Sequence, residues 1–368
     1  MSNGSRLASA IGHKLCALVF GVGLALLVGV ASTSEGGMRI AILPFQNVSG
    51  HVQAPTFITP LLEPALRDRG YDIVEPKALE SFLAQRRIRA PNKLSLEQLL
   101  ALRDQFGAAL ALMGSIDLFA DTAGNPQWGI SARLRDIGSG QIVWADAAGF
   151  TGDDFTGFLG LGTITFPEQL AVKTVQRLFR NLPAEGMAPD AKRPVPSGPG
   201  KASRWVFRSP RLDTDPPKRI AVFPFENGTE RRGAALIVDD LLTVGLFQAG
   251  RFQVEDPGEV YRGFQFLGFV PYGGIDLETL QVIRDNFGVD AVIVGRVEDY
   301  NEGLRPGVSA SPSIALDARM LDVRTGEILW MGYHEARAED SQIVLEFGMI
   351  KSMVPLGMKA IAELVATM

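Results

Sequence analysis

The residues whose types could support chemistry are few and scattered along the chain. Gly157-Phe-Leu-Gly-Leu-Gly162 has glycine spacing similar to a phosphate-binding loop, but no Lys-Ser/Thr pair follows it. It also does not come directly after the first strand of a βαβ unit, so we do not expect a phosphate site. The paired carboxylates Asp153-Asp154 and Glu339-Asp340 could serve acid–base catalysis only if one pKa were raised. Nothing nearby in the sequence indicates such a shift, and solvated loop charges are expected there.

Cysteine and histidine are too rare for the common metal sites. Cys16 is the only cysteine, and His13, His51 and His334 lie far apart in the sequence. A disulfide within one chain is therefore excluded, and a zinc or other transition-metal site is not expected. No serine lies in a Gly-x-Ser-x-Gly nucleophile elbow. The sequence predicts no catalytic residues, no cofactor and no metal, and hence a protein that is not an enzyme.

The composition is that of a globular protein. The chain has 368 residues, 46% hydrophobic and 21% charged, which is enough for two domains of ordinary size. A net charge of −5 argues against nucleic-acid binding, which normally requires a basic excess or a basic face.

The first 37 residues have the features of an export signal. Arg6, His13 and Lys14 precede an uncharged run from Leu15 to Ala31, whose last three residues are small enough for a cleavage site. The alternative is an uncleaved anchor, because the run is at the lower limit of the length that spans a bilayer. We predict a signal peptide or N-terminal anchor over residues 1–37.

The position of Cys16 argues against a lipid anchor. A lipoprotein carries its cysteine at the end of the apolar run, whereas Cys16 lies at the start of this one. With either form of the N-terminal segment, the rest of the chain is expected in the periplasm. Membrane association, with the inner or the outer membrane, would depend on this segment.

One stretch of sequence occurs twice. Arg39-Ile-Ala-Ile-Leu-Pro-Phe-Gln-Asn47 returns as Arg219-Ile-Ala-Val-Phe-Pro-Phe-Glu-Asn227. A short apolar run that ends in proline is typical of a buried strand leading into a turn. The repetition indicates that the chain contains two copies of one architecture.

The longest repeated block predicts a helix followed by a strand. Residues Ser95–Gly107 and Asp276–Gly288 each begin with a good N-cap and end with a glycine suited to a left-handed conformation. Leucine, isoleucine and phenylalanine recur along one helical face in both blocks. Each apolar strand that follows contains one glycine, Gly114 or Gly295, at which a side chain is expected to obstruct close packing.

A hairpin follows in both copies. Residues 130–135 and 316–320 alternate between apolar and other side chains, and each run leads through an Asp-x-x-x-Gly turn to a second strand ending in tryptophan. Arg133 and Arg319 alternate with the apolar residues, so we expect them on the solvated face of each sheet.

These patterns together define the predicted organisation. The fold class is α/β, with two tandem copies of a mixed five-stranded sheet flanked by helices. The first domain spans residues 38–182 and the second spans residues 218–368. Residues 183–217 are rich in Pro, Gly, Ser and Lys and are expected to be a linker, although Trp205-Val-Phe207 could dock onto a domain.

The order of the motifs resembles one known family. It runs from a strand with Pro-Phe-x-Asn, through a helix with Arg-Asp-x-Phe-Gly, to a hairpin of the form Arg-x-x-Asp-x-x-x-Gly-x-Ile-x-Trp. This combination resembles the domain shared by the N-terminal part of TolB and the curli-secretion protein CsgG. The resemblance implies no catalysis and a role in protein contact or ring assembly in a Gram-negative cell envelope. The chain lacks a lipobox cysteine and a β-propeller, so it is not a whole TolB.

Aromatic residues in the unduplicated segments are the predicted partner contacts. The alternative is that these side chains only cover the sheets. The candidates are Tyr261, Phe264, Phe266, Phe269 and Tyr272 in the second copy, and Phe150, Phe155 and Phe158 in the first.

Two functions remain as hypotheses. The first is a non-enzymatic periplasmic assembly module that binds envelope proteins or further copies of itself. The alternative is a component of a curli-type outer-membrane secretion pore, which would need long alternating strands in segments 149–165 and 334–352.

Overall fold

The computed structural model describes residues 38–122, 124–157, 161–185, 203–268, 275–304, 311–342 and 348–368. These residues belong to one compact unit. The expected signal peptide or anchor lies outside the described residues. Within the described ranges, no helix combines the length and the apolar character needed to cross a bilayer.

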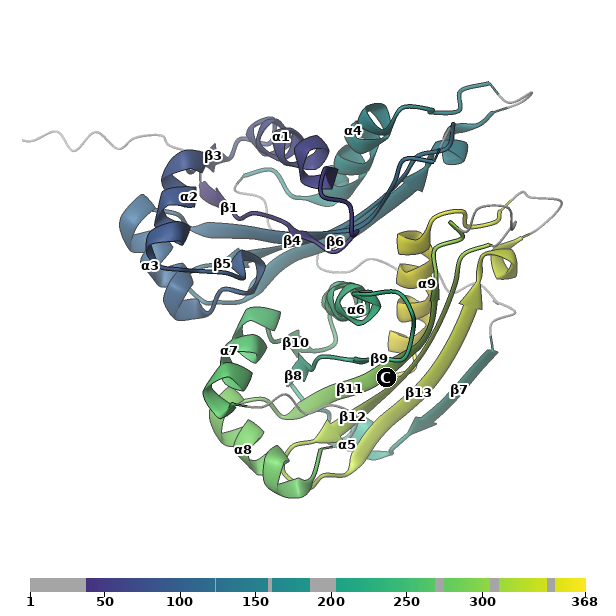
Figure 1. The fold of residues 1–368 in the computed structure, drawn as a ribbon. Helices are drawn as coiled ribbons and strands as arrows, with labels where there is room; N and C mark the ends of the chain where they lie inside the picture. The colour runs from purple at the N-terminus through teal and green to yellow at the C-terminus, as the bar shows by residue number, and fades with distance from the viewer. Residues whose placement is uncertain are drawn as a thin grey trace, which may run out of the picture. The chain divides into compact units, whose positions relative to one another are not determined.

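The first half of this unit is built on a mixed sheet with strand order β3-β1-β4-β5-β6 (Figure 1). Its parallel part consists of β1 (Arg39–Ile42), β2 (Gln46–Asn47) and β3 (Asp72–Ile73), which are ordered around β4 (Leu110–Ala120). Its antiparallel part is the hairpin of β5 (Gln127–Asp136) and β6 (Ile142–Thr151), with β5 paired to β4.

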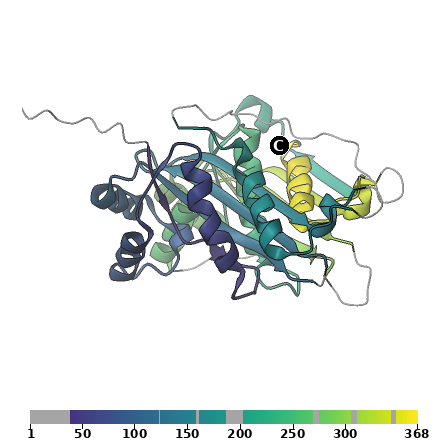
Figure 2. The ribbon, with the colours of Figure 1, turned by 90° about the horizontal axis from the view of Figure 1, so that it is seen from above.

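Helices from the first half cover both faces of this sheet. α1 (Ala54–Arg67) and α4 (Pro167–Leu178) lie across one face, as the view from above shows (Figure 2). α2 (Pro76–Gln85) and α3 (Leu96–Phe106) cover only one end of the other face. The described residues of this half also form the short 3-10 turns η1 (Pro91–Lys93), η2 (Gly152–Phe155) and η4 (Phe179–Asn181).

The second half repeats this arrangement. Its sheet has the order β10-β8-β11-β12-β13-β7, so each strand of the first sheet has a counterpart in the same place. The strands are β8 (Arg219–Val222), β9 (Glu226–Asn227), β10 (Gln253–Val254), β11 (Ala291–Asn301), β12 (Ser313–Asp322) and β13 (Ile328–Arg337). The helices are α6 (Ala234–Ala249), α7 (Pro257–Leu267), α8 (Leu277–Phe287) and α9 (Met353–Val365), and η5 (Ala338–Ser341) follows β13.

In the part of the chain that the structure describes, the second sheet has one strand without a counterpart in the first sheet. β7 (Ser203–Arg208) lies in the segment expected as a linker, and it pairs antiparallel with β13 along the sheet edge. The short helix α5 (Arg211–Thr214) then leads into β8. The first sheet ends at β6, which is the equivalent of β13.

Two mixed sheets flanked by helices confirm the predicted fold class. The sheets have six and seven strands rather than five. The difference arises because β2 and β9 are separate short strands beside β4 and β11, and because β7 extends the second sheet.

The duplicated residues act as caps and turns. Ser95 begins α3 with a capping box, in which Gln98 and not the acidic Glu97 is the reciprocal partner. Asp276 begins α8 by accepting a hydrogen bond of 2.7 Å from the Thr279 N–H. Both helices end at a glycine in the left-handed conformation, as the sequence predicts.

The glycines of β4 and β11 permit close packing, also as predicted. A Cβ added at Gly114 would lie 2.5 Å from the Ser131 carbonyl oxygen and 2.7 Å from the Phe45 ring. A Cβ added at Gly295 would lie 2.2 Å from the Asp317 carbonyl oxygen and 2.4 Å from the Phe225 ring. The repeated Pro-Phe motif therefore needs a glycine opposite its phenylalanine.

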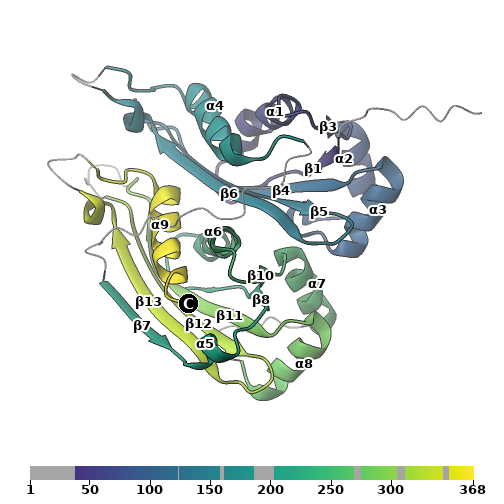
Figure 3. The same cartoon turned by 180° about the vertical axis from the view of Figure 1, so that it is seen from behind.

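The second half packs on the first sheet, and the two halves are consequently not equivalent. α6 and α9 contact β6 and β5 on the face opposite α1 and α4 (Figure 3). The first sheet is thus enclosed between two helix layers, and every residue of β4 is buried. The second sheet has α6 and α9 on one face, while α7 and α8 cover only one end of its other face.

This packing overturns one expectation from the sequence. Arg133 was expected to be solvated, but its residue is only 4% exposed. The alternation of the hairpin is as predicted, since Ala132 and Leu134 lie in the core on the opposite face. The face that carries Arg133 is covered by the second half.

Candidate functional site

The most strongly charged buried site joins the two halves. Arg133 and Arg135 project from β5, and Asp256 lies at the start of α7. Arg133 Nε donates to Asp256 Oδ2 at 2.6 Å, and Arg135 Nη1 donates to Asp256 Oδ1 at 3.0 Å. Asp240 of α6 lies 3.7 Å from Arg133 and adds a second negative charge. We call these four residues the inter-half ion cluster.

The donors of this cluster are satisfied by the first half. Arg133 Nη2 donates to the Asn92 carbonyl oxygen at 2.5 Å, and Arg135 Nη1 donates to the Leu94 carbonyl oxygen at 2.8 Å. Asp256 also accepts a 2.7 Å hydrogen bond from the Gly258 N–H and so caps α7. Burial opposes the ionisation of Asp256, but Arg133 and Arg135 outweigh it and lower its pKa. A buried carboxylate saturated in this way holds structure together and is not poised to transfer protons.

Glu259 extends the contact between the halves. It lies in the first turn of α7 and accepts hydrogen bonds from Arg135 and from the Leu96 N–H at the start of α3. A carboxylate at a helix N-terminus is favoured by the helix dipole and by the unpaired N–H groups there. An acidic residue of the second half therefore stabilises a helix of the first half.

Two further carboxyl groups near this contact have raised pKa values. Burial raises the pKa of Asp239 to about 8, against the opposing hydrogen bond from the Phe225 N–H. Asp239 lies in the wall of a cavity of about 170 Å³ beside α7. Burial, followed by the negative charge of Asp240, raises the pKa of Asp117 well above its usual value. Both groups favour the protonated form in the folded chain.

These shifts predict how stability depends on pH. The folded chain binds the Asp239 proton more tightly than the unfolded chain, whose pKa is near 3.8. The free energy of unfolding should therefore fall as the pH rises from 4 to 8, on the order of 1 kcal/mol per pH unit at the steepest point. Asp239→Asn keeps the acceptor for Phe225 and should flatten the profile measured by urea unfolding. The same change at the exposed Asp285 of α8 is the control, and equal profiles for both variants would contradict the assignment.

The paired carboxylates found in the sequence are capping groups. Asp154 accepts a 2.7 Å hydrogen bond from the Thr151 N–H at η2, and Asp340 accepts one of the same length from the Arg337 N–H at η5. Burial raises the pKa of Asp154, which the sequence did not predict. The repetition of this geometry in both halves indicates a structural role for these carboxylates.

Two side-chain contacts bring together residue types that occur in catalytic sites. His334 Nε2 lies 2.9 Å from Glu363, beneath α9. Lys359 Nζ donates to the Ser341 hydroxyl at 2.6 Å and lies 3.9 Å from Glu363. Neither contact was predicted from the sequence, because the residues that meet are many positions apart. Within the described ranges, no group of three or more His, Cys, Asp or Glu side chains is arranged to hold a metal ion.

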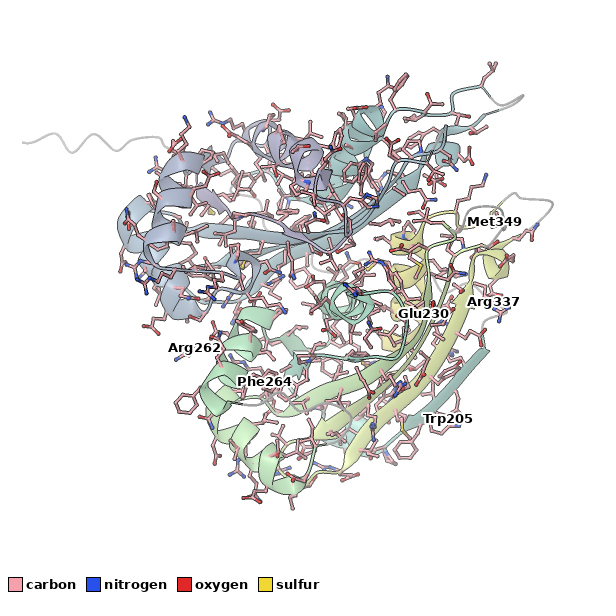
Figure 4. All side chains as sticks on the ribbon, in the orientation of Figure 1. Trp205, Glu230, Arg262, Phe264, Arg337 and Met349 are labelled. Carbon is pink, nitrogen blue, oxygen red and sulfur yellow. The ribbon has the colours of Figure 1, made fainter. Side chains whose placement is uncertain are left out.

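The largest difference between the halves is an uncovered area on the second sheet. Beyond the end covered by α7 and α8, the side chains of Trp205 and Phe207 on β7 and of Tyr333 on β13 face away from α9. Trp205 is 53% exposed and Phe207 is 44% exposed, and Trp205 projects from the sheet in Figure 4. We call this surface, completed by Asp317 and Arg319 of β12, the open face.

The predicted contact aromatics of α7 separate into exposed and buried residues. Phe266 is 80% exposed, and Tyr261 is exposed beside Lys93, whose ammonium lies 5.6 Å from the ring centroid. Phe264 is only 4% exposed and packs 4.7 Å from Phe223 of β8, ring centroid to ring centroid. Phe264 is labelled on α7 in Figure 4. The prediction that Phe264 contacts a partner is therefore corrected, because it covers the sheet, as the alternative stated.

The remaining candidates are distributed over the first half and the undescribed segments. Phe150 and Phe155 are half-buried, and their rings meet edge to face at 5.1 Å at the end of β6. Phe158, Phe269 and Tyr272 lie outside the described residues. The structure therefore brings Phe150 and Phe155 together. It does not bring these two residues next to the described candidates of α7.

The sequence predicted the open face only in part. Trp205 and Phe207 were noted as residues that could dock onto a domain, and they do so through the backbone of β7. The signal was the alternation in Ser203–Arg208, where Arg204, Val206 and Arg208 occupy the other face. Their guanidinium groups and the valine side chain contact the second half, which leaves the two aromatic rings exposed.

One family model matches part of the chain. Residues 211–367, which run from α5 to just after α9, match the family model of GNA1162-like lipoproteins. A comparison with curated proteins gives no match. The match to the family model lies entirely in the second half.

Three solved structures are similar in fold. The PelC dodecamer from Paraburkholderia phytofirmans has 17% identity and a TM-score of 0.32, over 45% of this chain and 95% of that chain. Lipoprotein GNA1162 from Neisseria meningitidis has 20% identity and a TM-score of 0.28, over 31% and 79% of the two chains. TolB from Acinetobacter baumannii has 16% identity and a TM-score of 0.23, over 48% of this chain and 33% of that chain.

 At these values the likeness concerns the fold alone. TolB is one of the two proteins that the sequence resembles, and the resemblance to CsgG stays a prediction.

Proposed function

We propose that the protein is a non-enzymatic docking component of the bacterial cell envelope, and that it binds a protein partner through the open face of the second sheet. The observation that carries the proposal is the different use of one sheet face in the two halves. In the first sheet this face is buried under α6 and α9, whereas in the second sheet it presents Trp205 and Phe207. In the first sheet, this face is therefore already a packing surface for another part of the chain.

The chemistry of the open face suits a protein partner. Aromatic rings supply large apolar contact area at low entropic cost, and they are enriched where proteins bind each other. Arg296 pairs with Glu226 and Glu298 at the margin of this surface, at 3.0 and 3.1 Å. An apolar patch with a charged margin is the usual composition of a protein interface.

The envelope location is supported by two features of the sequence. The chain begins with an apolar segment of the export type, and its second half matches a family of lipoproteins. The two domains are proposed to span residues 38–182 and 218–368, with β7 serving as an edge strand of the second. The ion cluster and the capping carboxylates have structural roles, which supports a function without catalysis.

The segments that a curli-type pore would need as long alternating strands contain other elements where the structure describes them. The described parts of segments 149–165 and 334–352 form the ends of β6 and β13, the turns η2 and η5, and the residues that lead into α4 and α9. These elements are accounted for by the α/β fold.

Site-specific photocrosslinking in intact cells tests the proposal. A photoreactive phenylalanine analogue placed at Phe207 should form a crosslink to one envelope protein or to a second copy of the chain. The matched control is the same analogue at Phe166, an exposed aromatic residue at the start of α4 and away from the open face. A yield at position 207 no higher than at position 166 would argue against a partner on the open face.

A second prediction concerns substitution of the two exposed aromatic residues of β7. Trp205→Ser with Phe207→Ser should reduce crosslinking from a probe at Tyr333 by about tenfold or more, because hot-spot aromatics contribute most of the binding energy. The unfolding midpoint should change little, since both rings are exposed. Unchanged crosslinking in a folded double variant would contradict the proposal.

A further inference from the structure

The free edge of the first sheet borders a groove. The groove has a volume of about 550 Å³, and five consecutive residues of β6, from Asp146 to Phe150, line it. Side chains of a strand alternate between the two faces, so consecutive residues can line one groove only if the strand presents its edge to it. The other walls come from Arg177 of α4 and from Pro355 and Met358 of α9.

The hydrogen-bond pattern identifies which groups of β6 point into the groove. Gly152 N–H donates to the Pro126 carbonyl oxygen at 2.9 Å, and the register pairs Thr151 with Gln127. In an antiparallel pair the residues that bond to the neighbour alternate with those that do not. The N–H and C=O groups of Ala145, Ala147 and Gly149 therefore point away from β5, toward the groove.

Side chains of this protein already bond some of these edge groups. Gln248 of α6 donates to the Ala145 carbonyl oxygen at 3.2 Å, and the Ala147 N–H donates to Asp146 Oδ1 at 2.9 Å. Among the described residues, none bonds to the N–H or C=O of Gly149 on this side. The edge therefore has bonding capacity that the first half does not use.

The second half shows what occupies the equivalent edge. There β7 pairs antiparallel with β13, and the Ser209 N–H donates to the Leu329 carbonyl oxygen at 2.8 Å. Met331, Tyr333 and Glu335 thus bond to β7, and their counterparts in β6 are Ala145, Ala147 and Gly149. The edge positions that carry a strand in the second sheet pair with no strand of the described residues in the first.

We propose that this groove binds an extended segment of a partner protein as an additional antiparallel strand on β6. Such a strand would cover about five residues, the length over which β6 lines the groove. This site is separate from the open face and does not depend on it.

The walls of the groove define the chemistry of the segment. Side chains on the α4 side of the added strand would meet Arg177, whose guanidinium lies 3.3 Å from Asp146. Side chains on the other side would meet Pro355 and Met358, because a Cβ at Gly149 would point to Pro355 at 3.0 Å. The segment should therefore alternate between acidic and apolar residues. The edge-to-face pair of Phe150 and Phe155 lies where β6 ends.

A labelled peptide tests the proposal with the full-length protein. The probe is a seven-residue peptide in which Val and Glu alternate, and its binding is measured by fluorescence polarisation. We expect saturable binding, together with slower hydrogen exchange at the Ala147 and Gly149 amides. The matched probe carries N-methyl groups on the residues that face β6, and it should bind about tenfold more weakly because it cannot donate to the edge. Equal binding of both peptides, or no binding of either, would overturn the proposal.

Edge variants give a second test. Ala147→Pro removes a donor that points into the groove and leaves the ladder with β5 intact, so binding should fall about tenfold. Ala147→Ser is the matched control, because it changes the same side chain but keeps the backbone N–H, and it should leave binding unchanged. Retained binding in folded Ala147→Pro, or an equal loss in Ala147→Ser, would reject the site. Trp205→Ser with Phe207→Ser should still bind the peptide, which separates this site from the open face.

Discussion

Replacing Asp256 with asparagine is expected to lower the free energy of unfolding by about 3–5 kcal/mol. Asparagine has the same shape and can still accept the Gly258 N–H that begins α7. It removes the negative charge that lies between Arg133 and Arg135, which are both buried. Arg133 would then keep only the more distant Asp240, at 3.7 Å, and Arg135 would keep only Glu259, at 3.2 Å. Urea unfolding followed by circular dichroism measures the loss.

Asp276→Asn is the matched control for this prediction. Asp276 occupies the same capping position in α8 and accepts a hydrogen bond from the Thr279 N–H, but it lies at the surface without a buried cation. Its substitution should cost well under about 1 kcal/mol. Equal losses in the two variants would show that Asp256 acts only as a helix cap, and that the ion cluster does not join the halves.

The ion cluster also shows what the sequence could not predict. The alternation around Arg133 correctly separated the two faces of β5, but alternation does not state what covers each face. The repeat suggested that Arg133 and Arg319 share one environment. Arg133 is buried by the second half, whereas Arg319 lies half-buried on the open face. Only the packing of one half on the other distinguishes them.

One signal in the sequence did mark this packing. α1 is amphipathic, with Thr56, Thr59 and Arg67 exposed along its outer side. Its counterpart α6 is apolar on nearly all sides, and its residues Leu241 and Val244 are both buried. A helix that is apolar all round is normally covered on all sides. Comparing the two copies of this helix would have predicted that the second copy lies between two sheets.

Local features were predictable because they depend on neighbouring residues. The capping residues Ser95 and Asp276 and the glycines Gly114 and Gly295 have the roles that the sequence indicated. The groove along β6 was not predictable, since its walls come from helices of both halves. The exposure of the α7 aromatics depends on the rotation of that helix about its axis, which a single sequence does not determine.

Two phenylalanines of α7 give the most direct test of this rotation. Phe264→Ala should lower the free energy of unfolding by about 3–5 kcal/mol, because it leaves a cavity between Phe223 and Phe287 in the core. Phe266→Ala should change it by less than about 0.5 kcal/mol, since the ring is 80% exposed. The two substitutions are identical and lie two positions apart, so helix propensity contributes equally to both.

The pair also separates stability from association. Phe266 and Arg262 line a cavity of about 400 Å³, and the other lining residues come from both halves. If α7 contacts a partner, Phe266→Ala should weaken crosslinking or self-association while the unfolding curve stays unchanged. Phe264→Ala should weaken association only in proportion to the unfolded fraction. A large loss of stability in Phe266→Ala would place its ring in a packed environment, and it would remove the exposed side of α7 from the candidate contact surfaces.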